Sequence, residues 1–389
     1  MKKIISVLTA TRAEYGLLKP IVVKLNEIGE FDVRIVVTGA HLSSEFGLTY
    51  KEIDKDGFHI DEKIEILLSS DTPASISKSM GLAMIGFADY FGKLKPDLLI
   101  LLGDRYETLA VAMTAMNQRI PIAHLYGGET TEGAIDDSIR HVITKLSYLH
   151  FTSTDDYRKR VIQLGESPDR VFNVGAIGIE NILNEKLFTK EELEATLQVD
   201  LNNTYAMVTF HPVTLEKNSA KRQIESLLEV CKSYEKMNFI FTKANADSEG
   251  RIINQFIDEY AKTNDNIMAF TSLGMIKYLS ALKYSAMVIG NSSSGLLEAP
   301  SFGIPTVNIG DRQKGRIQAS SVINCEPTIE DIKKAIDIAL SKDFTKKAKE
   351  TSNPYGNGKT SEKVVDVIME FVLDKKIYLK KKFYDCEVR

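Results

Sequence analysis

The sequence predicts an α/β protein built from two doubly wound parallel sheets. Short runs rich in β-branched residues alternate with longer helical patterns along the chain, which is typical of parallel sheets joined by helices. The strand-like runs are apolar throughout, so helices should cover both faces of each sheet. At 389 residues the chain exceeds the ~250 to 300 at which a single core stops growing, which predicts two domains.

The expected strands fall into two groups. They are KIISVLTAT, DVRIVVTG, DLLILLGD, PIAHLYGG and LHFTST in the first half, then YAMVTFHP, FIFTKA, IMAFTSL, AMVIGNSS and TVNIG in the second. Residues 184–204 between the groups are polar and strandless, which places a boundary near residue 185. We therefore expect domains over residues 1–185 and 186–360, followed by a helix and a solvated basic tail over 361–389.

Composition and charge exclude several classes of protein. Hydrophobic residues at 43% and charged residues at 26% are typical of a globular chain. The net charge of −4 provides no positive field for a nucleic acid. No run approaches the ~18 to 20 apolar residues of a membrane span, and the N-terminal apolar run is too short for a signal peptide. We expect a cytoplasmic protein with no nucleic-acid or membrane partner.

The three cysteines do not indicate a redox or metal function. Cys231, Cys325 and Cys386 are far apart and form no CxxC pair, so neither a disulfide framework nor a zinc site is supported. Reduced thiols used as small apolar side chains are the expected state. The histidines at 124, 141 and 150 lack metal-ligand spacing and are expected to be structural.

Polar side chains follow the predicted strands at their carboxyl ends, where open parallel sheets bind ligands. In the first half they are Arg12, Glu14, His41, Asp104, Arg105, Glu107 and Glu129. In the second half they are His211, Asn245 and the serines of GNSSSG. We expect all of them to face one crevice between the two domains.

The segment GNSSSGLLE suits a nucleotide. Its small residues, between a strand and a helix, let backbone N–H groups and the hydroxyls of Ser292 and Ser293 approach a diphosphate. A serine N-cap followed by a tight turn would give the same pattern. Glu298 favours the nucleotide, because a carboxylate one turn into the same helix can accept hydrogen bonds from two ribose hydroxyls. His211, at the mouth of the second sheet, can donate to a phosphate oxygen or can be a satisfied histidine at a strand end.

Clustered carboxylates indicate proton chemistry in the first half. Asp104 ends an apolar strand, so burial should raise the pKa of its carboxyl while Arg105 lowers it, a combination that marks acid/base groups. Farther along, YGGETTEGAIDDSIRH places Glu129, Asp136 and Asp137 ahead of a helix. The two aspartates could cap that helix, act in catalysis, or do both.

These motifs occur together in one order, and as a set they resemble a known family. TRAEY, GDRYE, GGE…DDSIRH, HPVT, GNSSSG…E, GDRQKGR and NPYGNGK, spread over residues 3–372, are similar to the hydrolysing UDP-N-acetylglucosamine 2-epimerases. The resemblance implies a GT-B fold, with two Rossmann-like domains facing a cleft and the nucleotide held mostly by the C-terminal domain. It also implies a homodimer or homotetramer.

The resemblance assigns roles residue by residue. It implies nucleotide contacts at Arg12, Arg105, His211, Asn245, Ser292, Ser293, Glu298 and Arg312, and catalytic acids at Asp104 and at Asp136 or Asp137, with Glu129 as a further acid. We also expect His211 to act in catalysis and Arg140 to contact the substrate. One departure stands out: many members read HIEGGE where this chain reads HLYGGE, so Tyr126 occupies a position that is often a catalytic glutamate. The loop from Glu129 to Asp136 is also one residue longer.

The implied reaction converts UDP-N-acetylglucosamine to N-acetylmannosamine and UDP through a glycal, the first step of sialic acid biosynthesis. It calls for acids and bases and for donors to the diphosphate, with no metal or other cofactor. The same architecture also serves GT-B glycosyltransferases, non-hydrolysing epimerases and, in a different class, non-catalytic nucleotide-sugar sensors. Within the family, GDP-N-acetylglucosamine and a UDP-linked diacetamido-bacillosamine are alternative substrates.

Overall fold

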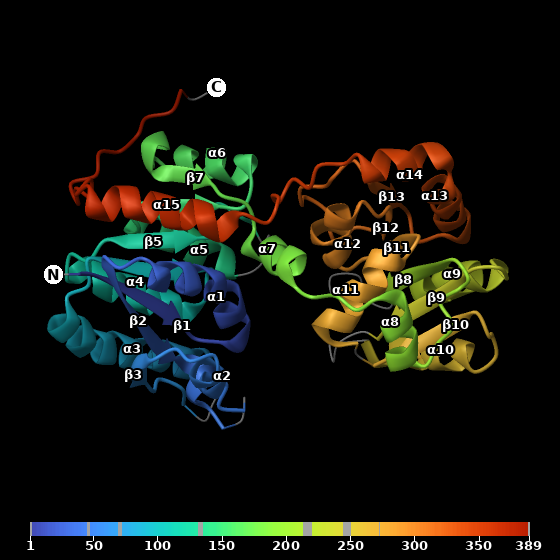
Figure 1. The fold of residues 1–389 in the computed structure, drawn as a ribbon, viewed down its shortest axis with the longest axis horizontal. Coiled ribbons are helices and arrows are strands. Elements are labelled where there is room, and N and C mark those ends of the chain that lie inside the picture. The colour runs from blue at the N-terminus through green and yellow to red at the C-terminus, as the bar shows by residue number, and fades with distance from the viewer. Residues whose placement is uncertain are drawn as a thin grey trace. The chain divides into compact units, whose positions relative to one another are not determined.

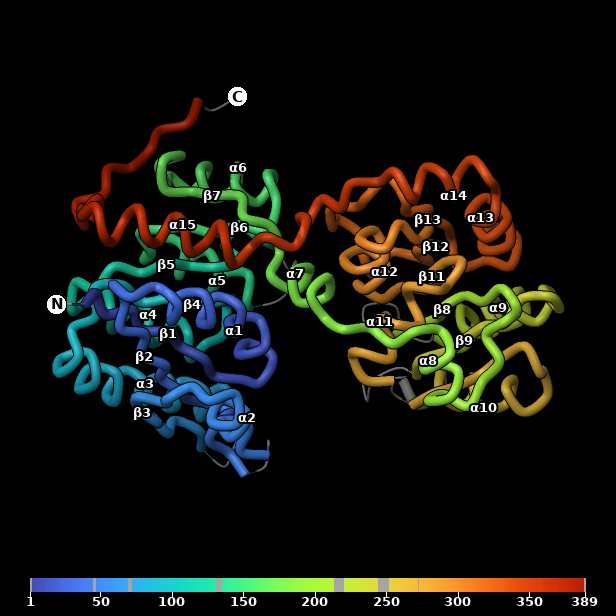
Figure 2. Tube along the Cα trace, in the orientation of Figure 1, coloured from blue at the N-terminus to red at the C-terminus, as the bar shows by residue number. Residues whose placement is uncertain are grey.

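The chain folds into two compact α/β units. A computed structural model describes residues 2–44, 47–68, 72–130, 135–212, 220–243, 250–271 and 273–387. Unit 1 comprises Met1–Asn181 with Tyr355–Arg389, and unit 2 comprises Ile182–Pro354. The trace in Figure 2 leaves unit 1 near helix α7 and returns to it after α14, so the C-terminal segment belongs to unit 1.

Unit 1 is built on a seven-stranded sheet, all of whose paired strands are parallel, in the order β3-β2-β1-β4-β5-β6-β7 (Figure 1). The strands are β1 Lys3–Thr9, β2 Phe31–Thr38, β3 Ile60–Ile64, β4 Leu98–Leu102, β5 Ile122–Leu125, β6 Leu149–Thr152 and β7 Val171–Asn173. The helices are α1 Arg12–Glu27, α2 Tyr50–Lys55, α3 Pro73–Leu94, α4 Tyr106–Asn117, α5 Ile135–Leu146, α6 Asp155–Gln163, α7 Ile177–Asn184 and α15 Thr360–Leu373. The strand order reverses between β1 and β4, which is the switch point where such sheets bind ligands.

Two separate cores cover the two faces of this sheet. On one face, strand residues such as Ile5 and Ile100 pack with Leu18 of α1 and Val364 of α15. On the other face, the neighbouring strand residue Leu101 packs in a core formed mainly by α3, α4 and α5. Since successive side chains of a strand point to opposite faces, burial on both sides explains why the strands are apolar throughout.

Unit 2 repeats this plan with a six-stranded sheet in the order β10-β9-β8-β11-β12-β13, again parallel in every pair. The strands are β8 Tyr205–Thr209, β9 Asn238–Thr242, β10 Ile267–Phe270, β11 Met287–Gly290, β12 Thr306–Ile309 and β13 Val322–Cys325. The helices are α8 Lys190–Leu197, α9 Ala220–Ser233, α10 Gly250–Ala261, α11 Gly274–Tyr284, α12 Ser294–Leu297, α13 Ile329–Leu340 and α14 Lys342–Lys349. At the switch between β8 and β11, Gly290 lies so close to its neighbour that a Cβ atom would be 2.0 Å from the Thr209 carbonyl oxygen.

All ten strands expected from the sequence are present, and the described residues contain three further strands that were not expected. The additional strands β3, β7 and β13 are the last in their sheets. Their burial is interrupted, as in β3, where Glu62 and Lys63 are exposed between two buried isoleucines. An edge strand pairs on one side only, so it needs no continuous apolar run.

Two general expectations concern membranes and metals. In the described part of the chain, no helix is long and apolar enough to cross a membrane. Within the same residues, no group of three or more His, Cys, Asp or Glu side chains is arranged to hold a metal ion.

Candidate active site

Asp104 lies in the loop between β4 and α4, beside the switch point of unit 1. Gly103, with φ of +77°, turns the chain out of the strand in the left-handed region that favours glycine. The Asp104 carboxylate pairs with the buried guanidinium of Arg140 on α5. Burial raises the pKa of Asp104, while Arg140 lowers it and Asp136 raises it. The opposition of burial and positive charge expected from the sequence is present, with Arg140 rather than Arg105 as the principal cation.

Asp136 and Asp137 both lie in the first turn of α5, where a carboxylate stabilises a helix. Asp137 also approaches Arg140, the partner of Asp104: its Oδ1 lies 3.7 Å from Nη1 of Arg140, and its Oδ2 lies 3.5 Å from Nε2 of His141. Asp136 is exposed. Asp137 is therefore joined by ionic contacts to Arg140, and Asp136 affects Asp104 through its charge.

Glu129 and Tyr126 follow β5 but have different surroundings. Glu129 is partly exposed, and its Oε1 accepts a hydrogen bond of 2.7 Å from Ser153. The Tyr126 hydroxyl accepts hydrogen bonds from the backbone N–H groups of Ile177 and Gly178, at 2.9 and 3.4 Å, at the start of α7. Burial, followed by the charge of Glu129, raises the pKa of the Tyr126 phenol, so this side chain stays neutral near pH 7. The contacts of Tyr126 therefore fix the start of α7.

Arg105 belongs to a second acidic cluster on the same sheet edge. Its Nε pairs with Oε1 of the buried Glu107 at 2.5 Å and lies 3.9 Å from Oε1 of Glu14. Glu14 also accepts a 2.7 Å hydrogen bond from the Ala10 backbone N–H. Burial is the main reason why the pKa of Glu14 is raised to about 7, with Glu107 adding to it. The sequence placed Glu14 and Glu107 at strand ends but assigned them no role; their position in the first turn after a strand was the available signal.

Two predicted substrate contacts are not part of these clusters: Arg12 lies apart from them, and Asn245 lies outside the described residues. Arg12 is largely exposed, and its Nε pairs with Oε1 of Glu52 at 3.0 Å. Asn245 falls within residues 244–249, outside the part of the chain that the structure describes.

Three buried histidines of unit 1 have structural partners. His41 contacts Thr9 and Thr49 through its two ring nitrogens, at 3.0 and 2.9 Å. His124 on β5 contacts the Gly103 carbonyl oxygen, and His150 on β6 contacts Glu166. In each, burial is the largest influence and lowers the pKa of the imidazole. His141, by contrast, is only partly buried.

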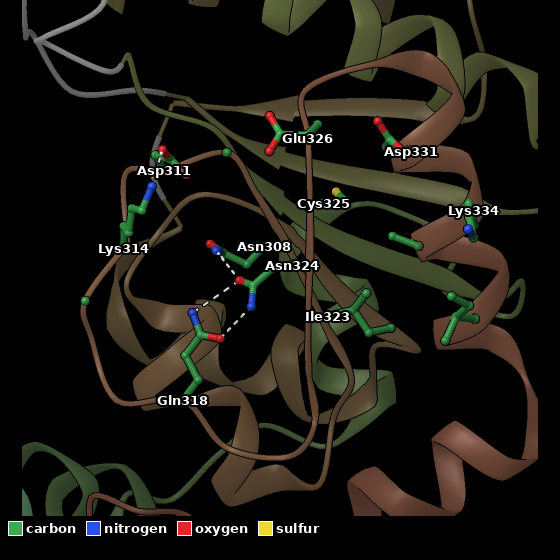
Figure 3. Close-up of a pocket in the computed structure, with 14 residues that line it drawn as sticks. Asn308, Asp311, Lys314, Gln318, Ile323, Asn324, Cys325, Glu326, Asp331 and Lys334 are labelled. Atoms are coloured by element: carbon green, nitrogen blue, oxygen red, sulfur yellow. Dashed lines mark hydrogen bonds and ion pairs between the residues drawn. The ribbon is translucent and has the colours of Figure 1, made fainter.

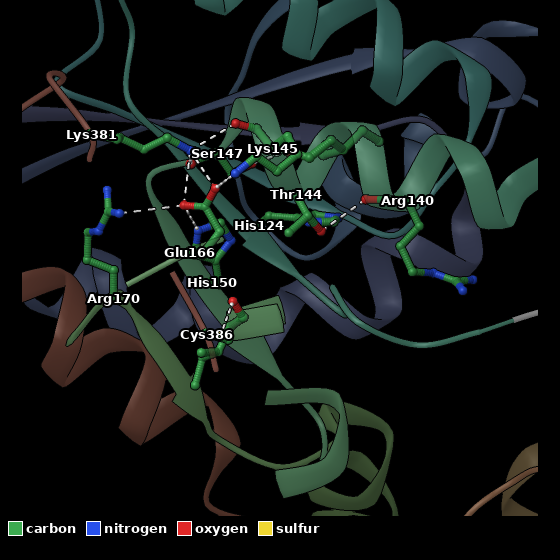
Figure 4. Close-up of polar contacts among 12 residues, drawn as sticks. His124, Arg140, Thr144, Lys145, Ser147, His150, Glu166, Arg170, Lys381 and Cys386 are labelled. Carbon is green, nitrogen blue, oxygen red and sulfur yellow. Dashed lines mark hydrogen bonds and ion pairs between the residues drawn. The ribbon is translucent and has the colours of Figure 1, made fainter. Parts of the chain in front are cut away.

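A buried ionic cluster ties the C-terminal tail to unit 1 (Figure 4). Lys381 donates to both oxygens of Glu166, at 3.0 and 3.1 Å, and to the backbone oxygens of Lys145 and Ser147 near the end of α5. Lys145 lies 2.6 Å and Arg170 3.6 Å from the same carboxylate. Against the cost of burial, the contact with His150 and the surrounding lysines lower the pKa of Glu166 to about 2. Most tail residues are exposed, as expected, but Lys381 is a fixed attachment.

In unit 2, Asn291 organises the loop after β11, although the sequence gave it no role. Its side-chain Oδ1 accepts from the His211 backbone N–H at 2.7 Å, and its Nδ2 donates to the His211 carbonyl oxygen at 2.8 Å. The Asn291 carbonyl oxygen accepts from Arg312 and Gln313, at 3.0 and 2.9 Å. The predicted contacts His211 and Arg312 are thereby brought to one buried asparagine.

Glu298 is partly buried close to the serine loop. Ser294 donates to its Oε2 at 2.5 Å, and the Tyr278 hydroxyl lies 2.6 Å from the Ser294 oxygen. Burial raises the pKa of Glu298, and the Ser294 contact lowers it. The sequence placed Glu298 one turn into a helix, but α12 is only four residues long and Glu298 is its C-cap, while Ser293 is its N-cap. Ser292 also contacts this turn, accepting from the Ser294 backbone N–H at 3.4 Å.

A separate cavity of about 470 Å³ lies beside β12, β13 and α13 (Figure 3). Asp311, Lys314 and Lys334 are among its charged residues, and Asn308, Asn324 and Gln318 form an amide chain on one side. None of the described residues that line it is a predicted substrate contact.

The fold has close counterparts among solved structures. The crystal structure of UDP-GlcNAc 2-epimerase from Neisseria meningitidis, bound to UDP-GlcNAc, has a TM-score of 0.78 over 95% of this chain and all of its own, at 19% sequence identity. Together with the two parallel sheets, this similarity confirms the GT-B type, with two doubly wound Rossmann-like domains.

Sequence comparisons give the family. Residues 23–369 match the family model described as UDP-N-acetylglucosamine 2-epimerase, so the chain belongs to this family of 2-epimerases. It is 45% identical, over 88% of its length and 89% of the relative's, to the GDP/UDP-N,N'-diacetylbacillosamine 2-epimerase (hydrolyzing) of Campylobacter jejuni. It is also 40% identical to the polysialic acid biosynthesis protein P7 of Escherichia coli, over 99% of this chain and 98% of that protein. The expected family is confirmed.

Proposed function

We propose that the protein is a hydrolysing 2-epimerase of nucleotide-linked 2-acetamido sugars. The observation that carries the proposal is the ion pair between Asp104, which is partly exposed, and the buried Arg140 at the switch point of unit 1, with Asp137 beside it. Burial raises the pKa of the Asp104 carboxyl, which makes it a stronger base than an exposed aspartate. Family membership supports the same reaction.

In the proposed first step, Asp104 removes the proton from carbon 2 of the sugar. The C1–O bond to the diphosphate breaks, the electron pair of the C2–H bond forms the C1–C2 double bond, and the nucleoside diphosphate leaves. A second acid then returns a proton to carbon 2 on the opposite face, while water adds to carbon 1. The products are the nucleoside diphosphate and the free 2-epimer, and one water is consumed.

We assign the second acid to Glu129, with Asp136 and Asp137 as the alternatives. Glu129 is partly exposed and accepts a hydrogen bond of 2.7 Å from Ser153 through Oε1, whereas Asp137 lies in ionic contact with Arg140. Tyr126 is not assigned an acid role, because burial raises the pKa of its phenol and makes it a weaker acid.

Nucleotide binding is assigned to unit 2. Glu298 would accept from the ribose hydroxyls, while His211, Arg312 and the serines 292 and 293 would face the diphosphate. His211 and Arg312 are both hydrogen-bonded to Asn291, and Glu298 and Ser292 are both hydrogen-bonded to Ser294, which supports this assignment. Arg12, Arg105 and Arg140 stay predicted substrate contacts, whose positive charge would favour departure of a diphosphate.

For the sugar, we propose a nucleotide-linked N,N'-diacetylbacillosamine. The support is the 45% identity to a relative whose name gives that substrate. UDP-N-acetylglucosamine, giving N-acetylmannosamine for sialic acid synthesis, is the second candidate; the family description and the 40% identity to a polysialic acid biosynthesis protein favour it. A cytoplasmic location and a homodimeric or homotetrameric state remain predictions.

The substrate can be identified by comparing kcat/KM for UDP- and GDP-linked diacetylbacillosamine, UDP-N-acetylglucosamine and GDP-N-acetylglucosamine. Release of the nucleoside diphosphate is followed by a coupled assay and the free sugar by NMR. We expect at least about 10-fold preference for a diacetylbacillosamine nucleotide, since groups recognised by hydrogen bonds discriminate strongly. A preference for UDP-N-acetylglucosamine would reverse the substrate assignment, and nucleotide release that requires a second sugar as acceptor would contradict the epimerase.

A further inference from the structure

His124 connects the catalytic loop of unit 1 to its interior. The side chain is fully buried on β5, and its Nε2 donates a 2.8 Å hydrogen bond to the Gly103 carbonyl oxygen. Gly103 immediately precedes Asp104 and holds the left-handed turn that presents it. Movement of this carbonyl would therefore move the Asp104 carboxylate.

Thr144 connects the same histidine to the other half of the ion pair. Its Oγ1 lies 3.3 Å from His124 Nδ1 and 3.0 Å from the carbonyl oxygen of Arg140, one turn earlier on α5. Figure 4 shows Thr144 between His124 and the backbone of Arg140. The buried His124–Thr144 pair thus contacts the backbone at both partners of the Asp104–Arg140 interaction.

The loop that carries Glu129 packs against the same pair. A Cβ atom at Gly127 would lie 3.0 Å from Thr144 Oγ1 and 3.2 Å from His124 Nδ1, so the space is filled. Three segments with predicted catalytic residues therefore meet around two buried polar side chains. Side-chain movement is restricted in such a packed polar contact.

The contacts of His124 exclude a proton-transfer role for its ring. Because a carbonyl oxygen only accepts, the proton of the neutral ring is on Nε2, and Nδ1 faces the hydroxyl of Thr144. Burial lowers the pKa of His124 to about 3, so the ring stays neutral under working conditions. Its function is then geometric.

We propose that His124 and Thr144 are positioning residues that hold Asp104 and Arg140 in register for the reaction. This inference rests on the proposed function, because it presumes that Asp104 reacts with the sugar. Displacement of a reacting group by about 1 Å can lower a rate about 100-fold, so loss of the pair should reduce kcat strongly.

Matched substitutions test the proposal. His124→Asn removes the donor to the Gly103 carbonyl, whereas His124→Gln places an amide N–H near the original Nε2 position. Thr144→Val removes the hydroxyl at nearly constant volume, and Thr144→Ser keeps it. We expect His124→Asn and Thr144→Val to lower kcat about 10- to 100-fold with KM changed less than about threefold, and the glutamine and serine variants to recover most of the rate.

The measurements are kcat and KM for nucleotide release, with UDP affinity and the melting temperature recorded for each variant. Retention of full kcat by folded His124→Asn and Thr144→Val would overturn the proposal. Equal losses in the conservative and non-conservative variants would also overturn it, because a general packing defect predicts them. Asp104→Asn distinguishes failure of the proposed function from failure of the positioning role. If Asp104→Asn stays active, the proposed function is wrong. If Asp104→Asn is inactive while His124→Asn has a normal rate, only the positioning role is wrong.

Discussion

Replacement of Glu298 by alanine tests the nucleotide assignment in unit 2. The Glu298 side chain is partly buried and accepts from Ser294 through Oε2 at 2.5 Å, and we assign Oε1 to the ribose hydroxyls. Hydrogen bonds to a charged acceptor contribute roughly 1.5 to 3 kcal/mol each, and with one such bond lost we expect UDP to bind about 10- to 100-fold more weakly. Glu298→Gln keeps one acceptor and should lie between the wild type and Glu298→Ala.

Isothermal titration calorimetry with UDP measures this loss directly. Because burial raises the pKa of Glu298, wild-type affinity should also increase with pH as the carboxylate ionises, while Glu298→Ala should lose that dependence. Melting temperatures without ligand show whether Ser294, deprived of its acceptor, destabilises the unit. A folded Glu298→Ala variant with UDP affinity within about threefold of the wild type would refute the assignment.

Three further perturbations address unit 1. Arg140→Met should move the acidic limb of the pH profile of kcat to higher pH, because the pKa of Asp104 rises further when the guanidinium is removed. An acidic limb at the same pH as in the wild type would contradict the role of the Asp104–Arg140 pair. Glu129→Gln should cost at least about 100-fold in kcat and Tyr126→Phe much less, and the reverse order would transfer the acid role. Glu166 has a folded pKa of about 2 against 4.5 as its ordinary value, so its stabilisation is present above pH 4.5 and is lost as the pH falls toward 2. In urea unfolding at pH 7, the free energy of unfolding of Glu166→Gln should therefore be lower than that of the wild type by at most about 3 kcal/mol, and the two values should converge near pH 2. A difference in unfolding free energy that stays constant with pH would contradict this prediction.

Much of the fold could be predicted because its central strands are buried on both faces. Segments such as DLLILLGD can satisfy that environment only as interior parallel strands, and β4 is one. The edge strands lack this constraint, as the exposed positions of β3 and β13 show. The return of α15 to the first core depends on packing of residues such as Val364 with strand residues far away in sequence, which no local pattern encodes.

The sequence predicted which residues belong to the candidate site but not which of them form ion pairs and hydrogen bonds with one another. Strand-end position alone identified Asp104 and Arg105, yet the cation that contacts Asp104 is Arg140, 36 residues away on another element. Asn291 was given no role and His124 was expected only to be structural, because the particular contacts of both side chains are with backbone atoms of distant loops. Such contacts depend on tertiary structure and leave no periodic signal in the sequence.

The central claim is proton exchange at carbon 2 coupled to release of the nucleoside diphosphate, and one experiment tests it directly. The protein is incubated in deuterated water with UDP-linked diacetylbacillosamine and, separately, with UDP-N-acetylglucosamine, and the products are examined by proton NMR. We predict free 2-epimerised sugar with one deuterium at carbon 2, in equal amount to the released UDP, and none with Asp104→Asn. Free sugar that keeps the original configuration and its C2 proton would contradict the account, because simple hydrolysis at carbon 1 would then suffice.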